Sequence, residues 1–215
     1  MKGTRNSLVV VCVLVALVFL AACSEDSLMG PEPQANLAVE KGLSAEEINW
    51  IPWKAESREH VLSQEQKLEI QSQIMAAETG EAVRVLERKL FPGCEFEIVK
   101  RSKGATVGSW WTLNNQVEVP AEAFPEDLRI VGVFAAYLYG LPGVEFWPDQ
   151  EFDKNVRVTL SWDCLEFDGD PNDLKVYWLD ESTGLWVLVP DPEVNAEQKT
   201  VSVYVNHFTR YQWGL

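Results

Sequence analysis

The sequence predicts a mainly β protein, an antiparallel β-sandwich preceded by a short helical segment and a flexible tether. After residue 93 apolar and polar residues alternate, as where Val156, Val158 and Leu160 are separated by Arg157 and Thr159. A period of two is typical of a strand with one buried face. Turn-forming stretches separate these runs at short intervals, which favours a sandwich or barrel. Three such stretches are residues 168–173, 180–184 and 191–199.

The amino terminus has the features of a secretory signal. Lys2 and Arg5 lie before an uninterrupted apolar run from Leu8 to Ala22. The run is short for a membrane span and has the length of the apolar region of a signal peptide. Residues 1–22 are therefore predicted to be removed and to form no part of the fold.

The apolar run ends in Leu20-Ala21-Ala22-Cys23, which resembles the bacterial lipoprotein signal. The resemblance implies that the Cys23 thiol receives a diacylglycerol, that the chain is cut before it, and that the new amine is acylated. An ordinary cleaved signal with a stray cysteine, or an uncleaved anchor, is the alternative. Lipidation predicts an exported body held on a membrane by its acyl chains. By the same resemblance, Ser24 after the cysteine favours the outer membrane in a cell that has two membranes.

Residues 23–43 are predicted to be a flexible tether. They contain prolines, glycines and scattered acidic residues, and they have no periodic apolar face. Segments of this composition do not bury enough apolar surface to order themselves. The lipidated cysteine would thus be joined to the folded body by about 20 flexible residues, which span about 25 Å on average.

Residues 44–92 are expected to be mainly helical, and residues 93–215 are assigned to the sandwich. The clearest helix is predicted from Ser63 to Glu78, because Ser63 and Gln66 have the spacing of a capping box. Residues 81–91 fit a helix and a strand equally well.

The charge balance excludes partners that require a basic surface. The chain has 18 basic and 33 acidic residues and a net charge of -15. Loss of Lys2 and Arg5 with the signal takes the charge of the body to -17. Nucleic acid and anionic lipid surfaces attract clustered positive charge. We therefore expect no nucleic-acid partner, and membrane contact through the lipid anchor only.

Five segments of the second half are spaced in a recognisable order: residues 103–108, 117–127, 146–160, 176–190 and 205–211. Their order and spacing resemble a ZU-five-type β-sandwich, the module of zonula occludens proteins, netrin receptors and ankyrins. The likeness covers roughly residues 95 to 215. The chain departs from the pattern at Ala105, Asn155 and Thr209, where a glycine, a proline and a serine are usual. The resemblance implies that this domain acts as a scaffold or as a contact surface for other molecules.

The resemblance also singles out His207, Phe208 and Thr209, because some eukaryotic members cut themselves at a terminal His-Phe-Ser. The Thr209 hydroxyl would attack the Phe208 carbonyl, an N-to-O acyl shift would give an ester, and water would hydrolyse it, with His207 assisting proton transfer. The reaction also needs a strained peptide and a donor that stabilises the oxyanion. The alternative, which we favour, is that His207 packs at the end of a strand and that the protein is not an enzyme.

Two cysteines, Cys94 and Cys164, remain in the predicted exported body. An exported compartment permits a disulfide between them. Such a bridge would stabilise the fold by up to about 4 kcal/mol in the chain-entropy model. The sequence leaves open whether they pair or are two buried free thiols.

The loop with Asp168, Asp170, Asn172 and Asp173 has the oxygen ligands that calcium prefers. It lacks the glycine at the sixth place and the glutamate at the twelfth place of an EF-hand, so a solvated turn is favoured. The chain's two histidines are far apart in sequence and have no Cys-x-x-Cys partner. We therefore expect no metal site and no cofactor.

The nine tryptophans of the chain are spread along it, which fits strand and core packing. Trp110, Trp111 and Trp147 would form a platform for stacking sugar rings if they were exposed. Two functions are thus expected: contact with envelope or extracellular proteins, which we favour, and binding of carbohydrate. The exposure of these rings distinguishes them.

Overall fold

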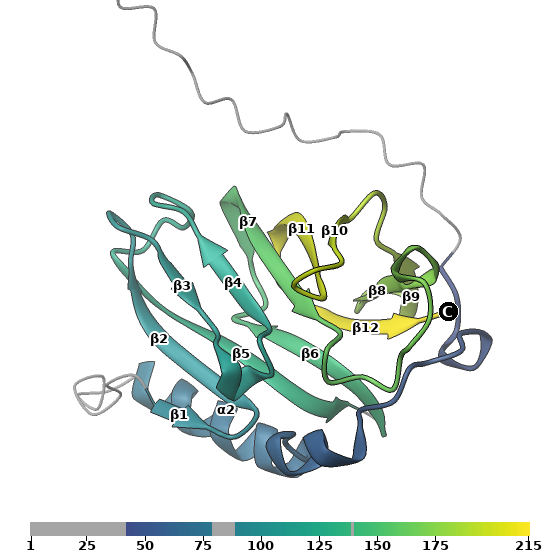
Figure 1. The fold of residues 1–215 in the computed structure, drawn as a ribbon. Coiled ribbons are helices and arrows are strands. Elements are labelled where there is room, and N and C mark those ends of the chain that lie inside the picture. Colours follow the sequence, from purple (N-terminus) through teal and green to yellow (C-terminus); the bar gives the residue numbers. More distant parts are fainter. Residues whose placement is uncertain (1–41, 79–88, 139) are drawn as a thin grey trace, which may run out of the picture. The chain divides into compact units, whose positions relative to one another are not determined.

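The computed structural model describes residues 42–78, 89–138 and 140–215. These residues belong to one compact unit. Cys23, the predicted signal and residues 23–41 of the predicted tether lie outside them. In the described part, two antiparallel sheets and a short helix before them confirm the predicted mainly β sandwich (Figure 1).

The first sheet has seven strands in the order β1-β2-β5-β6-β12-β8-β9. Neighbouring strands in it are antiparallel. Their bounds are β1 (Lys89–Phe91), β2 (Cys94–Lys100), β5 (Leu128–Leu138), β6 (Leu141–Trp147), β12 (Arg210–Gly214), β8 (Lys175–Asp180) and β9 (Leu185–Leu188).

The second sheet has five strands in the order β10-β11-β7-β4-β3, again antiparallel. Its two central strands, β11 and β7, are the longest of the sheet and pair along most of their length. Their bounds are β10 (Glu193–Asn195), β11 (Thr200–His207), β7 (Glu151–Ser161), β4 (Gln116–Val119) and β3 (Ala105–Val107).

The main core lies between the two sheets and is built from alternate residues of their strands. On β7, Val156, Val158 and Leu160 are fully buried, whereas Arg157 between them is partly exposed. Other strands contribute Val117, Val133, Val144, Val201, Val203 and Trp213 to the same cluster. The alternation seen in the sequence is thus the inward and outward facing of one sheet surface.

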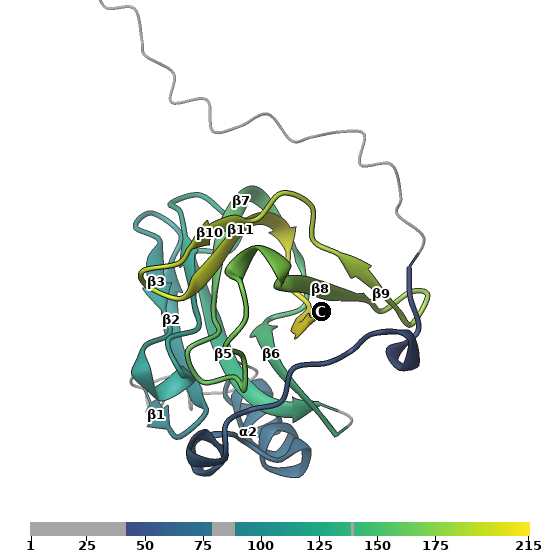
Figure 2. The same ribbon diagram turned by 45° about the vertical axis from the view of Figure 1, so that its right-hand side comes forward.

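Residues 43–62, which we call the N-terminal strap, run along the sandwich before the helix (Figure 2). The strap contains two 3-10 helices, η1 (Ala45–Glu47) and η2 (Ala55–His60). It joins the sandwich through isolated bridges between Leu43 and Trp186, Trp50 and Gly214, Trp53 and Leu165, and Leu62 and Ala136. The strap therefore supplies backbone partners to strands and loops that are far from it in sequence.

The tryptophans of the strap fasten it to the sandwich. The ring of Trp50 packs edge-on against Trp186, with centroids 5.0 Å apart. Trp53 is fully buried in the main core and packs edge-on against Trp213 at 5.5 Å. Edge-to-face pairs add about 0.5–1.5 kcal/mol each to the stabilisation from burial. The strap is thus part of the packed body.

Helix α2 (Gln64–Glu78) follows the strap and confirms the helix predicted from Ser63 to Glu78. Its start has the predicted cap, because the Ser63 N–H donates to Gln66 Oε1 (2.9 Å) and the Gln66 N–H donates to Ser63 Oγ (3.2 Å). Ile74 packs with Phe96 and Phe134 in a second apolar cluster, on the outer face of the seven-stranded sheet. Over the ranges described, no helix has the length and apolarity needed to cross a membrane.

A buried carboxylate, Glu145 on β6, joins α2 to the seven-stranded sheet. Lys67 of α2, only 4% exposed, donates to its Oε2. Arg210 Nε of β12 donates to the same oxygen at 2.8 Å, and Gln71 Nε2 of α2 donates to Oε1 at 2.6 Å. Arg210 also forms an ion pair with Glu181. We call Glu145, Lys67, Gln71 and Arg210 the Glu145 cluster.

The cluster keeps Glu145 ionised. Burial alone raises the pKa of the Glu145 carboxyl, but the charges and hydrogen bonds of Lys67 and Arg210 outweigh burial and hold its pKa below the ordinary 4.5. The folded state therefore binds the Glu145 proton more weakly than the unfolded state does. This contribution to stability is present above about pH 4.5 and is lost as the pH falls through the lower pKa of the folded protein.

We expect Glu145→Gln to lower the free energy of unfolding by about 3–5 kcal/mol at pH 7, because it removes the buried carboxylate that pairs with Lys67 and leaves Arg210 paired with Glu181 alone. Urea denaturation measures the loss. The matched control is Glu122→Gln, which breaks an exposed pair with Arg101 and should cost less than about 1 kcal/mol. The difference between wild type and Glu145→Gln should shrink below about pH 4.5. A difference that stays constant with pH would contradict this account.

Candidate functional site

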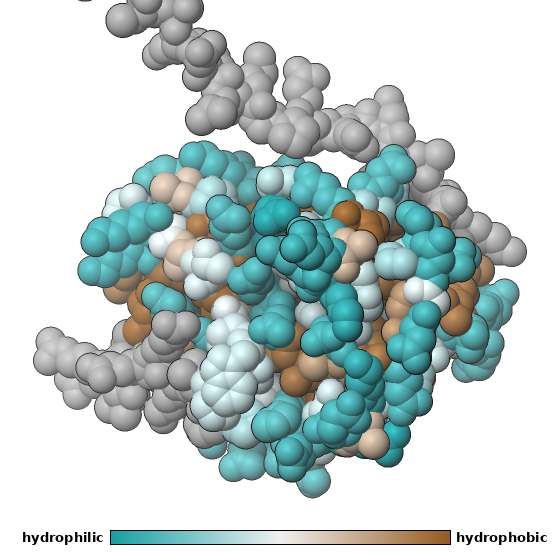
Figure 3. Space-filling view, viewed as in Figure 1, coloured by the Kyte–Doolittle hydropathy of each residue, from teal (hydrophilic) through white to brown (hydrophobic). Residues whose placement is uncertain are grey.

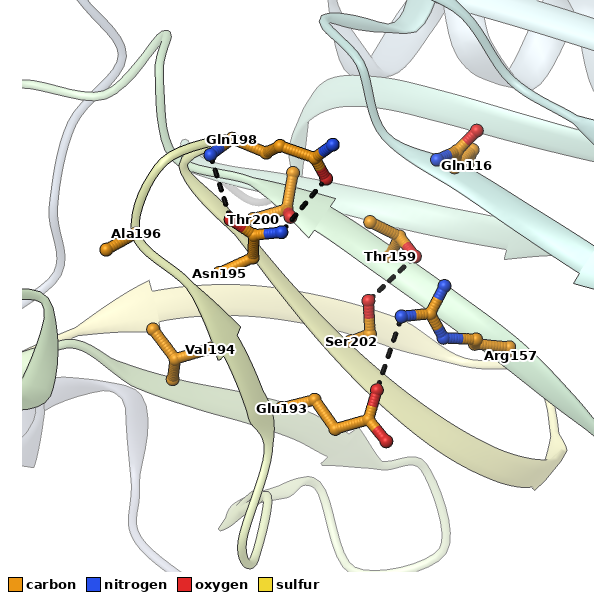
Figure 4. Close-up of a pocket in the computed structure, with 10 residues that line it drawn as sticks. All are labelled: Gln116, Arg157, Thr159, Glu193, Val194, Asn195, Ala196, Gln198, Thr200 and Ser202. Carbon is orange, nitrogen blue, oxygen red and sulfur yellow. Dashed lines mark hydrogen bonds and ion pairs between the residues drawn. The ribbon is translucent and has the colours of Figure 1, made fainter.

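A polar groove lies on the outer face of the five-stranded sheet (Figure 4). Its volume is about 420 Å³, within the usual range of ligand sites. Side chains from four strands and one hairpin line it: Gln116 of β4, Arg157 and Thr159 of β7, Glu193, Val194 and Asn195 of β10, Ala196 and Gln198 of the hairpin, and Thr200 and Ser202 of β11.

The register of the sheet brings the groove residues together. Gln116 pairs with Thr159, Thr159 with Ser202, and Ser202 with Glu193, so these four form one row across the strands. Paired residues of adjacent strands point to the same side of a sheet. Because the intervening valines point into the core, this row must face outward.

The floor of the groove is a pair of buried hydroxyl groups. Thr159 Oγ1 and Ser202 Oγ are 2.9 Å apart, and either can be the donor. Although both residues are on the outer face, they are only 6% and 4% exposed, because the neighbouring side chains rise around them. In such a pair, one hydroxyl hydrogen forms the hydrogen bond between the two groups. The other hydroxyl hydrogen can be donated to a ligand or to water.

The two ends of the groove are held by interactions within the sheet. At one end the guanidinium of Arg157 pairs with Glu193 at 3.2 Å. At the other end the hairpin between β10 and β11 is closed by Asn195, which accepts from the Gln198 N–H (3.0 Å) and donates to its Oε1 (3.1 Å). Figure 4 shows these two contacts on opposite sides of the Thr159 and Ser202 pair. The groove is thus preformed.

A second hollow, also of about 420 Å³, lies over the seven-stranded sheet. Its walls are mostly apolar and include Leu138, Leu141 and Trp186, with Arg210 of the Glu145 cluster at its side. Leu138 and Leu141 flank residue 139, which lies outside the described residues. Polar side chains held by the paired strands of one sheet line the groove, so the groove is the better candidate for specific binding.

His207, Phe208 and Thr209 lie where β11 ends and β12 begins. His207 Nδ1 is 3.1 Å from the Oδ1 of Asn206, and its ring packs edge-on against Trp178. The Thr209 hydroxyl donates to the carbonyl oxygen of a different strand, that of Leu179 (2.7 Å). The histidine nitrogen and the threonine hydroxyl are thus each engaged with another partner.

Phe208 is fully buried in the main core. Its ring packs against Phe152 at 4.5 Å and Phe146 at 5.7 Å. None of residues 207–209 has a positive φ. These contacts give the triplet a role in packing and in joining two strands, and self-cleavage stays a prediction that a mass measurement tests.

Cys94 and Cys164 are free thiols in the structure, so the disulfide that the sequence left open is not formed. Cys94 belongs to the cluster beneath α2, whereas Cys164 packs against the core between the sheets. The seven-stranded sheet separates these two clusters. Burial, aided by the Glu95 carboxylate, raises the pKa of Cys94, and burial also raises that of Cys164. Both therefore remain protonated at neutral pH, which makes them poor nucleophiles.

The acidic loop forms a capped turn. Asp170 Oδ1 accepts from the backbone N–H of Asn172 (2.9 Å) and from its side-chain amide (2.8 Å), at the start of the 3-10 helix η5 (Pro171–Asp173). Asp168 and Asp173 are exposed. Among the described residues, no group of three or more His, Cys, Asp or Glu side chains is placed to hold a metal ion.

The three tryptophans considered for sugar stacking are divided between two places. Trp110 and Trp111 stack on each other, with centroids 3.9 Å apart, in the 3-10 helix η4 (Trp110–Thr112) between β3 and β4. Trp110 is 58% exposed, while Trp111 is partly buried. Trp147 packs against the apolar cluster beneath α2. A platform of all three rings is therefore absent, and Trp110 alone presents an open face.

No protein-family model matches the chain, and no curated protein matches it either. The segments that resemble a ZU-five-type sandwich correspond here to strands of both sheets. Residues 117–127 contain most of β4, residues 146–160 nearly all of β7, and residues 176–190 contain β9 and most of β8.

The groove was not predicted from the sequence, although the sequence contains one pattern that points to it. Polar residues occupy every outward position of β7 and β11 near the groove, namely Arg157, Thr159, Thr200 and Ser202. The alternation predicts that each lies on an outer face. The pattern could not show that β7 and β11 are neighbours, because the paired residues Thr159 and Ser202 are 43 residues apart in sequence. The face of the molecule seen in Figure 3 is mostly hydrophilic, with hydrophobic residues in separate patches.

We expect the purified protein to give the mass of a chain that is unbroken between Phe208 and Thr209. Thr209→Val removes the hydrogen bond to Leu179 and should lower the free energy of unfolding by about 0.5–1.5 kcal/mol. Thr209→Ser keeps the hydroxyl and serves as the control. A wild-type fragment that ends at Phe208, absent from Thr209→Val, would instead show self-cleavage.

Proposed function

We propose that the protein is a lipid-anchored, exported envelope protein that acts by contact, as a structural or protein-interaction module. The observation that carries the proposal is the preformed polar groove on the outer face of the five-stranded sheet. The resemblance to ZU-five-type sandwiches supports it, because such modules act mostly as scaffolds or contact surfaces. The resemblance of residues 20–23 to the lipoprotein signal supports export and anchoring.

The position of the groove in the sheet suits a contact site. Its floor lies on β7 and β11, each of which pairs with a strand on both sides. Central strands resist local opening better than edges do, so a binding surface on them is held in shape. The inward faces of the same strands are packed in the main core. Binding would thus cost little ordering of the protein.

A second candidate function is carbohydrate binding at Trp110. The observation that favours it is the exposed ring of Trp110, which the stacked ring of Trp111 holds in place. A rigid exposed aromatic face can cover the apolar face of a sugar ring. Trp110 would act alone in this case, because Trp147 packs against the second apolar cluster.

The anchor is tested by Cys23→Ser, which removes the thiol that would form the thioether. We expect wild type to incorporate labelled palmitate in bacterial cells, and the variant to lose the label. Cys164→Ser is the matched control and should keep the label. Labelling of Cys23→Ser as strong as that of wild type, or no labelling of wild type, would contradict lipidation at this residue.

The contact site is tested with a photoreactive benzoylphenylalanine in place of Gln198, an exposed residue of the hairpin that lines the groove. We expect irradiation of intact cells to give a discrete adduct from this position. The same residue in place of Leu128 is the control, since that side chain is also exposed but belongs to the other sheet. Equal adducts from both positions, or none from position 198, would remove the groove as the contact site.

A further inference from the structure

We propose that the groove, together with the ring of Tyr204 beside it, binds a neutral oligosaccharide. The inference rests on the proposed function, in that it takes the groove to be the contact site and names the class of its ligand. It concerns a surface different from the tryptophan pair in η4.

The hydrogen-bonding groups of the groove fit hydroxyl groups. Gln116 provides an amide that both donates and accepts, Thr200 provides a hydroxyl, and the Thr159 and Ser202 pair keeps one hydroxyl hydrogen. Donors and acceptors are thus mixed in the lining of one groove. A sugar hydroxyl also donates and accepts, so it can satisfy neighbours of both kinds, which a purely anionic or cationic group cannot.

The charges of the groove point to a neutral ligand. Arg157 is paired with Glu193, so the groove has no unopposed charge among its lining residues. The whole chain carries a net charge of -15, which repels acidic polymers. A charged ligand would have to break the Arg157 pair or approach against the field of the protein.

Tyr204 adds the apolar surface that sugar rings require. It is 50% exposed and pairs across the sheet with Arg157. It follows Ser202 by two residues on β11, so it points to the same face, about 7 Å further along the strand. A sugar ring that stacks on Tyr204 would place the next ring over the hydroxyl pair. Aromatic rings are common at such sites because they bury a large apolar area without losing many rotamers.

The experiment uses the full-length lipidated protein in a detergent without a sugar head group. The probes are neutral tetrasaccharides of glucose, mannose and N-acetylglucosamine in several linkages, and binding is measured by saturation-transfer NMR and calorimetry. We expect at least one to bind with a Kd of about 0.1–1 mM, since each neutral hydrogen bond contributes little net affinity. The Kd should not change between about 50 mM and about 500 mM salt.

Variants locate the site. We expect Tyr204→Ala and Gln116→Ala each to weaken binding about threefold to tenfold, and Tyr204→Phe, which keeps the ring, to change it less than about twofold. Leu128→Ala is the control with an exposed apolar residue elsewhere, and it should bind like wild type. Thermal unfolding of every variant confirms that the fold is intact.

Several outcomes would overturn the inference. They are failure of wild type to bind any tetrasaccharide of the panel, binding only of acidic oligosaccharides, and loss of binding in Trp110→Ala while Tyr204→Ala binds normally. If no sugar binds but the photoreactive residue at position 198 captures an envelope protein, the ligand class is wrong and the proposed function stands. If neither position 198 nor the sugar panel gives a signal, both fail.

Discussion

The register of β7 against β11 is the constraint on which both the core and the groove depend. In this register Val158 lies beside Val203, and Thr159 lies beside Ser202. The valines of both strands face the seven-stranded sheet, and the hydroxyls face outward. A shift of β7 by one residue would bury Arg157 and expose Val156 and Val158, at a cost of several buried apolar side chains. The apolar core thus holds the polar groove in place.

The other sheet depends on a different kind of interaction. Its outer face is covered by α2 and by the N-terminal strap, and each is fastened by specific contacts as well as by apolar packing. Lys67 and Arg210 both donate hydrogen bonds to the carboxylate of Glu145. Removing one member of such a buried group of charges lowers stability strongly. Replacing the whole group by apolar side chains of similar shape can nevertheless give a protein of equal stability. The cluster therefore fixes which face of α2 meets the sheet, because the two α2 side chains that donate to Glu145, Lys67 and Gln71, lie on that face.

The sequence predicted the features that depend on local periodicity. The alternation of residues from Val156 to Leu160 correctly predicted a strand, and the spacing of Ser63 and Gln66 correctly predicted the start of a helix. What it could not predict depends on distant residues. Glu145 lies 78 residues from Lys67, and nothing in their neighbourhoods indicates that they meet. The two cysteines lie on opposite sides of one sheet, and predicting this requires the order of the strands in the sheet. Predicting the groove requires knowing which strands pair with β7, as well as the alternation of polar and apolar residues along β7.

The strap also determines how the fold would respond to a pull on its amino-terminal end. Its bridges occur one after another along the chain, beginning with Leu43 on β9 and ending with Leu62 on β5. A steady load would reach the two hydrogen bonds between Leu43 and Trp186 first, then the bridge of Trp50, and the buried Trp53 later. Each released residue would lengthen the chain by about 3.5 Å. The first part of the strap, up to Trp50, would therefore yield in steps and absorb extension before the load reached Trp53 in the core between the sheets.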